Sequence, residues 1–151
     1  MRHLKPTPVV ADGMLYLSTP SNRAIALDAE TGTEIWQFDP QAGRSERKFF
    51  QHRGVVYWQS ETGDDRRILY ETFDGRMICL NAKTGSPCQG FGTNGVVNLR
   101  VGGANEFPDA EYAVTSPPAV YKDLVIVEAA VPDPSRGLRT KVHYPPSSAS
   151  V

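Results

Sequence analysis

The chain has 151 residues, of which 40% are hydrophobic, and its 16 basic and 17 acidic side chains nearly cancel. This length suits one domain, and the balanced charge gives no reason to expect nucleic acid as a partner. Thirteen glycines and 12 prolines are many for a helical protein and favour short strands joined by turns.

The N-terminal segment, residues 1–6, is basic but lacks the apolar core of a signal peptide. No apolar run further along the chain approaches the roughly 18 residues that a membrane span needs. The sequence therefore predicts neither a leader nor a membrane anchor within this chain.

The first predicted elements are two hairpins. Segments 7–10 and 14–18 flank Asp12-Gly13, and segments 23–28 and 34–38 flank the turn Asp-Ala-Glu-Thr-Gly at 28–32. An aspartate can bond the backbone two residues on, and glycine accepts positive φ, so both connections suit tight turns. Four short antiparallel strands in sequence are the blade of a β-propeller.

The second turn phrase recurs along the chain. Asp28 and Thr31-Gly32 are matched by Asn81 and Thr84-Gly85, an offset of 53 residues. This spacing suits a propeller with roughly 40–50 residues per repeat plus a loop. Trp36 ends the first phrase, and we predict that its indole lies against the Thr84-Gly85 turn of the next blade or an equivalent neighbour.

Two further units follow. Segments 53–58, 68–71 and 77–80 predict the second blade, with Asn94-Gly95 as a tight-turn signal before 96–97. A third unit begins at 115–120 and continues through 123–127, which is rich in β-branched residues.

The predicted fold class is all-β, an incomplete β-propeller of about two and a half four-stranded antiparallel blades over residues 1–137. Residues 138–151 are predicted to be an irregular, disordered tail that ends in Pro-Pro-Ser-Ser-Ala-Ser. No helix of more than about three turns is expected. Because closed propellers have 4–8 blades, we expect a fragment of a longer propeller.

The chain has two cysteines, Cys79 and Cys88. They could pair in an oxidising compartment, but two cysteines do not decide the compartment. The interpretation that we favour from the sequence is that Cys79 is a small buried apolar residue and nothing more.

The repeat phrases together resemble the dehydrogenases that depend on pyrroloquinoline quinone (PQQ), which are eight-bladed propellers. The resemblance rests on Thr-Pro-Val-Val at 7–10, the phrase that ends at Trp36, Arg-Gly-Val-x-Tyr-Trp at 53–58 and Thr-Ser-Pro-Pro at 115–118. It covers about residues 5–137. The last phrase, with Gly-Phe-Gly-Thr-Asn-Gly-Val-Val at 90–97, favours the membrane-bound glucose/quinate-type branch.

The resemblance implies a set of site residues. Arg53 matches an arginine that meets the carboxylates of PQQ, a task for which its planar fork is suited. Thr115 matches a hydroxyl donor, and His52 a histidine of the glucose-type branch. Asp133 falls at a carboxylate ligand of the calcium ion, a metal that prefers oxygen ligands. We expect Arg53, Thr115 and Asp133 to converge at one end of the blades.

Each of these residues also has a plainer interpretation. Arg53 would be a surface charge, Thr115 an ordinary strand residue and Asp133 a solvated loop carboxylate. The family's catalytic aspartate has no counterpart among residues 1–151, and we assign no catalytic residue to this chain.

The implied function is part of an oxidoreductase that uses PQQ and calcium to oxidise an alcohol group of a sugar or polyol. The resemblance further implies a periplasmic location and a quinone or cytochrome as electron acceptor. Two alternatives stay open. The chain could be a non-catalytic propeller segment that serves as a binding or assembly module, since fold alone does not give function. It could also be a truncated gene product without function.

Overall fold

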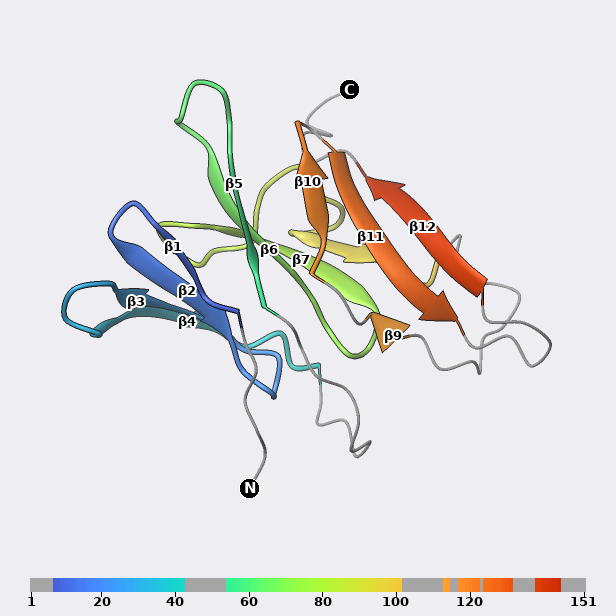
Figure 1. The fold of residues 1–151 in the computed structure, drawn as a ribbon, viewed down its shortest axis with the longest axis horizontal. Helices are drawn as coiled ribbons and strands as arrows, with labels where there is room; N and C mark the ends of the chain where they lie inside the picture. Colours follow the sequence, from blue (N-terminus) through green and yellow to red (C-terminus); the bar gives the residue numbers. More distant parts are fainter. Residues whose placement is uncertain are drawn as a thin grey trace.

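The fold is known from a computed structural model, which describes residues 7–42, 54–101, 113–114, 117–122, 124–131 and 138–144. Within these ranges every regular element is a β-strand, and the strands form three antiparallel sheets. Figure 1 shows the sheets side by side. This part of the chain has no helix long and apolar enough to cross a membrane. The prediction of an incomplete all-β propeller is confirmed.

The first sheet is a meander of consecutive strands, β1 (Val9–Ala11), β2 (Met14–Ser18), β3 (Ala24–Asp28) and β4 (Glu34–Phe38). It is built from the two hairpins that the sequence predicts. A bulge in the β3–β4 register falls between Ala26 and Leu27. The bulge locally strengthens the twist, as such irregularities do.

The second sheet is also a meander, of β5 (Val56–Gln59), β6 (Arg66–Glu71), β7 (Arg76–Asn81) and β8 (Val96–Asn98). The chain leaves this sheet after β7 and returns at Val96. Just before β8 it makes the predicted tight turn, in which Thr93 and Val96 exchange both backbone hydrogen bonds, at 2.9 and 3.1 Å. Asn94 and Gly95 both have positive φ there, at 51° and 77°, as this turn type requires.

The third sheet contains β9 (Ala113–Val114), β10 (Ala119–Tyr121), β11 (Leu124–Val131) and β12 (Leu138–Tyr144). β10 and β11 form the predicted hairpin, and β9 pairs with the far end of β11. β12 lies on the other side and pairs with β11 from Val125↔Tyr144 to Val131↔Leu138.

The prediction of an irregular tail is wrong for residues 138–144, which form β12. The sequence Leu-Arg-Thr-Lys-Val-His-Tyr alternates apolar or β-branched residues with basic ones, which is the period of a strand. The Pro- and Ser-rich residues that follow favour an irregular segment, but they begin only after β12 ends. Residues 145–151 lie outside the described residues.

The core consists of two apolar clusters, one in each seam between sheets. Alternation along β6 sends Ile68 and Tyr70 into the first cluster and Leu69 into the second, so the middle sheet is buried on both faces. The first cluster also contains Tyr16, Ala24, Ala26, Trp36, Val55, Ile78, Leu80 and Ala82. The second also contains Met77, Cys79, Cys88, Phe91, Leu99, Val125 and Val127.

Trp36 docks the first sheet on the second, as the repeat phrase predicts. Its side chain is only 8% exposed, and its Nε1–H donates to the carbonyl oxygen of Ala82 at 2.9 Å. The indole lies directly over Gly85, because a Cβ at that position would come within 2.6 Å of Cδ2 of Trp36. The predicted contact with the turn of the next blade is confirmed.

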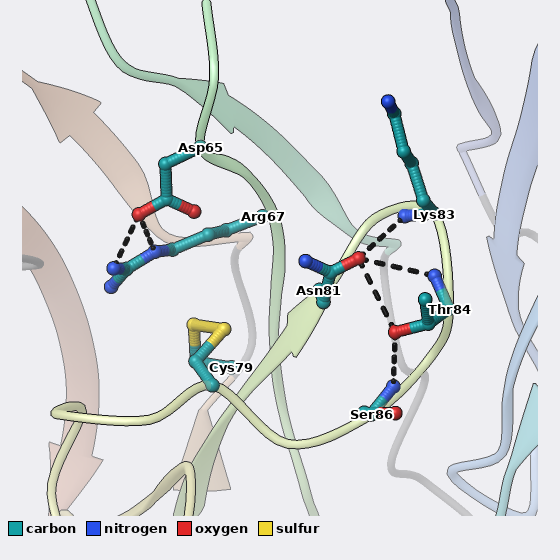
Figure 2. The surroundings of a disulfide bond; sticks show 8 residues. Asp65, Arg67, Cys79, Asn81, Lys83, Thr84 and Ser86 are labelled. Carbon is teal, nitrogen blue, oxygen red and sulfur yellow. Dashed lines mark hydrogen bonds and ion pairs between the residues drawn. A yellow bond between two sulfur atoms is a disulfide. The ribbon is translucent and has the colours of Figure 1, made fainter.

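The two repeat turns have the same hydrogen-bond pattern. In the first turn, Oδ1 of Asp28 accepts from the backbone N–H and the hydroxyl of Thr31, at 2.7 and 2.8 Å. In the second, Oδ1 of Asn81 accepts from the same two groups of Thr84, at 3.1 and 3.3 Å (Figure 2). The Thr31 N–H, with the Thr31 hydroxyl, lowers the pKa of the Asp28 carboxyl. The repeat in the sequence is therefore a repeat in atomic structure.

Gly85 and Gly32 offer a matched pair of substitutions. Their φ values are +70° and +73°, so alanine imposes the same backbone strain of roughly 1–2 kcal/mol at each. A Cβ at Gly32 has no heavy atom within 4 Å, whereas one at Gly85 meets the indole. We expect Gly85→Ala to lower the free energy of unfolding by about 2 kcal/mol more than Gly32→Ala, through overpacking. Urea denaturation of both variants measures the difference, and equal losses would contradict the docking geometry.

Candidate cofactor end of the blades

One edge strand of each sheet meets the others where the sheets converge. β5 contacts β1 on one side and β10 on the other, and Figure 1 shows all three beginning at the same, lower end of the sheets. The starts of the first two sheets touch at Gly54. A Cβ there would lie 2.7 Å from the carbonyl oxygen of Thr7, so any larger residue would push the two sheets apart.

The four site residues that the resemblance implies, Arg53, His52, Thr115 and Asp133, all lie outside the described residues. Their predicted convergence therefore stays a prediction.

The described residues next to these four lie at the lower end of the sheets. Arg53 directly precedes Gly54, and Thr115 directly follows Val114 of β9. Asp133 comes two residues after Val131, which ends β11. β9 pairs with the last part of β11, so these two segments share one end of the third sheet. A cofactor that touches three successive blades requires that the backbone beside its binding residues lies at one end of the sheets.

Polar contacts fasten the first two sheets together at this end. Oδ1 of Asn22, a fully buried residue between β2 and β3, accepts from the backbone N–H of Phe73 at 2.9 Å. Nη2 of Arg76 donates to the carbonyl oxygen of Pro40 at 2.9 Å and forms an ion pair with Asp74. The turns that surround the candidate site are thus held by contacts between blades.

Glu71 is a buried acid at the same end that the sequence analysis did not single out. It is the last residue of β6 and only 6% exposed. Burial raises the pKa of its carboxyl to about 9, so the group keeps its proton at neutral pH. The signal in the sequence is one acidic residue that ends the apolar run Ile-Leu-Tyr at 68–70.

The opposite end of the blades carries a second polar cluster, formed by Asp12, Tyr57 and Arg66. The hydroxyl of Tyr57 donates to Oδ2 of Asp12 at 2.5 Å, and Nη1 of Arg66 lies 3.1 Å from the same oxygen. Burial, together with the hydrogen bond to Asp12, raises the pKa of Tyr57 to about 12. This cluster joins β5 and β6 of the second sheet to the β1–β2 turn.

The second and third sheets are joined by Trp58, whose Nε1–H donates to the carbonyl oxygen of Lys122 at 2.8 Å. The guanidinium of Arg67 lies over the Trp58 ring, 5.4 Å from its centroid. In the described ranges no group of three or more His, Cys, Asp or Glu side chains is placed to hold a metal ion. Asp133, the predicted calcium ligand, is not among them.

Known proteins place this fold in a family. The sequence profile described as "PQQ: Glucose/ethanol/alcohol dehydrogenase, beta-propeller domain" matches residues 1–142. The chain is 36% identical over 142 residues to the quinoprotein glucose dehydrogenase of Escherichia coli (strain K12), over 84% of this chain and 17% of that protein. It is 34% identical over 142 residues to the probable quinate dehydrogenase (quinone) of Xanthomonas campestris pv. juglandis, over 80% of this chain and 18% of that protein.

Among solved structures, the quinohemoprotein alcohol dehydrogenase from Comamonas testosteroni matches with a TM-score of 0.69 and 27% sequence identity. The match covers 97% of this chain and 20% of that one. The chain thus spans a fifth or less of the length of these three proteins. The family profile reaches residue 142 and so includes most of β12, beyond the segment 5–137 that the sequence phrases covered. The chain belongs to the PQQ β-propeller domain family of glucose, ethanol and alcohol dehydrogenases.

Proposed function

We propose that this chain forms part of a PQQ-dependent dehydrogenase that oxidises an alcohol group of a sugar or polyol. The observation that carries the proposal is the family match over residues 1–142, which contains Arg53, His52, Thr115 and Asp133. The meeting of β1, β5 and β10 at one end supports it, because the segments that carry Arg53 and Thr115 lead into that end. The match to dehydrogenases favours this function over a non-catalytic assembly module.

Each site residue has a role in this proposal. Arg53 binds carboxylates of PQQ through paired N–H donors, and Thr115 donates its hydroxyl hydrogen to another. His52 contacts the cofactor, and Asp133 supplies an oxygen ligand to calcium. PQQ, when bound, supplies a quinone that accepts electrons from the substrate. The electron acceptor of the whole enzyme would be a respiratory quinone or a cytochrome.

The disulfide between Cys79 and Cys88 supports a periplasmic location for this protein. Disulfides form and persist in oxidising compartments such as the bacterial periplasm, whereas cytosolic thiols are kept reduced. The favoured interpretation of Cys79 as a buried residue without a covalent partner is therefore wrong, although the residue is fully buried.

A chimera tests the proposed function. Residues 1–142 replace the matching segment of the Escherichia coli quinoprotein glucose dehydrogenase, and glucose-dependent dye reduction is measured as PQQ is added with calcium. We expect activity that depends on PQQ. Arg53→Lys should raise the PQQ concentration for half-maximal activity by about tenfold, since lysine cannot replace a bidentate guanidinium.

Arg23→Lys is the matched control, because Arg23 is exposed and its guanidinium pairs with Asp39 on the surface. It should leave the PQQ requirement unchanged. A folded chimera without PQQ-dependent turnover would reject the proposed function. Equal effects of the two substitutions would reject the assignment of Arg53.

The isolated 151-residue chain should behave differently. It carries only a part of the cavity and no assigned catalytic base, so we expect weak or no binding of PQQ with calcium and no dye reduction with glucose. Absorbance titration and a dye assay measure both. Turnover by the chain alone would show that the catalytic machinery lies within these residues.

A further inference from the structure

We propose that the Cys79–Cys88 disulfide fixes the loop that receives Trp36, so that reduction by a dithiol loosens the docking of the first sheet on the second. The proposal concerns the seam between these sheets and is independent of the proposed function.

The disulfide joins β7 to the segment that follows the second repeat turn. The Cα atoms of Cys79 and Cys88 are 5.4 Å apart, and the N–H of Cys88 donates to the carbonyl oxygen of Cys79 at 2.9 Å. Both residues are buried in the second core cluster. Figure 2 shows the disulfide beside the turn that Asn81 organises.

The residues that receive Trp36 lie between the two cysteines. The Ala82 carbonyl oxygen accepts the indole N–H, and Gly85 lies under the indole ring. We call residues 82–85 the docking loop. The covalent bond therefore closes a short loop that contains the residues in contact with the Trp36 indole.

The two repeats differ in how the segment after the turn is held. In the first sheet, the turn that ends at Gly32 leads directly into β4, which pairs with β3 from Leu27↔Glu34 to Ala24↔Phe38. In the second sheet, the segment after Gly85 pairs with β7 over a shorter length. It makes the bridge Leu80↔Pro87, and two backbone hydrogen bonds, from Asn81 N–H to the Ser86 carbonyl at 2.8 Å and from Cys88 N–H to the Cys79 carbonyl at 2.9 Å. After Cys88 the chain leaves β7 and returns at Gly95, just before β8 begins at Val96.

The disulfide reinforces the shortened ladder. With the repeat offset of 53 residues, Cys79 corresponds to Ala26, which pairs with Trp36 in the first sheet. In the first sheet, pairing with β4 fixes the segment after the turn. In the second sheet, the covalent bond at the corresponding position helps to fix the segment after the docking loop. Without the bond, the loop is retained by non-covalent contacts alone: the Leu80↔Pro87 bridge, the turn at Asn81, and the hydrogen bonds from Ala82 N–H to the Arg66 carbonyl and from Cys88 N–H to the Cys79 carbonyl.

The redox step is an ordinary thiol–disulfide exchange. A dithiol gives up two electrons, the S–S bond breaks, Cys79 and Cys88 become thiols, and the dithiol closes to its own disulfide. The sequence contains two cysteines, so in this chain a reductant acts on no other disulfide.

The exchange rate of the Trp36 indole N–H with deuterated solvent tests the proposal. It is measured by NMR on the 151-residue chain with and without dithiothreitol. For a loop of this size, loss of the cross-link favours open forms by up to about 100-fold. We expect the Trp36 indole N–H to exchange faster by up to that factor, and the backbone amide of Ile78 in β7 to change much less.

Two further proteins separate local release from general loss of stability. A Cys79→Ala, Cys88→Ala chain should reproduce the reduced protein without reductant. Val127→Ala creates a cavity in the other seam and should accelerate Trp36 and Ile78 equally. The proposal is overturned if reduction leaves Trp36 exchange unchanged, or if it accelerates Trp36 and Ile78 by the same factor.

Discussion

Trp36→Ala is expected to lower the free energy of unfolding of the chain by about 3–5 kcal/mol, the range for removing a buried tryptophan. The substitution empties the seam between the first two sheets, where the ring also packs near Tyr16 with centroids 6.1 Å apart. It also leaves the Ala82 carbonyl without its donor. Urea denaturation followed by circular dichroism measures the loss.

Two companion substitutions separate the contributions. Ile35→Ala changes the neighbouring residue, which is 46% exposed, and should cost less than about 1 kcal/mol. Trp36→Phe keeps much of the ring volume but loses the indole N–H, and should cost an intermediate amount. If Trp36→Ala costs no more than Ile35→Ala, the docking role is refuted.

Glu71 should make the chain less stable as the pH rises from about 4.5 to 9. The carboxyl has its ordinary pKa of about 4.5 in the unfolded chain and a pKa of about 9 when folded. Between these values the folded chain holds a proton that the unfolded chain has released, so raising the pH favours unfolding. Between pH 4.5 and pH 7 the loss amounts to about 3 kcal/mol.

Glu71→Gln removes this dependence, because the amide does not titrate. Relative to the unsubstituted chain, the variant should gain stability steadily from pH 4.5 to pH 8, by about 3 kcal/mol or more in total. Urea midpoints at several pH values provide the measurement. Glu30→Gln, in the exposed turn of the first sheet, serves as the control and should leave the pH profile unchanged. Parallel profiles for Glu71→Gln and the unsubstituted chain would exclude a shifted carboxyl.

Local chemistry in the sequence was enough to predict the blades. Turn residues such as Asp28 and Asn81 act through bonds to atoms within three residues, so their pattern is visible without a structure. The docking of Trp36 was predictable because the two turns repeat. Each of these inferences depends on contacts that the repeat encodes locally.

Features that depend on distant contacts were harder to predict. The burial of Glu71 comes from packing around the end of β6, and an acid at the end of an apolar run does not by itself distinguish a buried from an exposed carboxyl. The disulfide forms across the turn at Asn81, after which Cys88 pairs back with Cys79, and the sequence does not show how far the chain stays paired after that turn. β12 does have a local signal, its alternation, which the adjacent prolines obscured. For Arg53, Thr115 and Asp133 the sequence gives a resemblance, and the structure describes only the strands beside them.

The meander topology of the sheets has a consequence for cooperativity. Each strand ladder in the described ranges joins strands of the same sheet that are close in sequence. Each sheet can therefore assemble by closing short loops. The sheets are joined through side chains in two seams, as in a one-dimensional array where each unit interacts only with its neighbours. A substitution in one seam therefore changes the coupling between two neighbouring sheets while every strand ladder within the sheets stays intact.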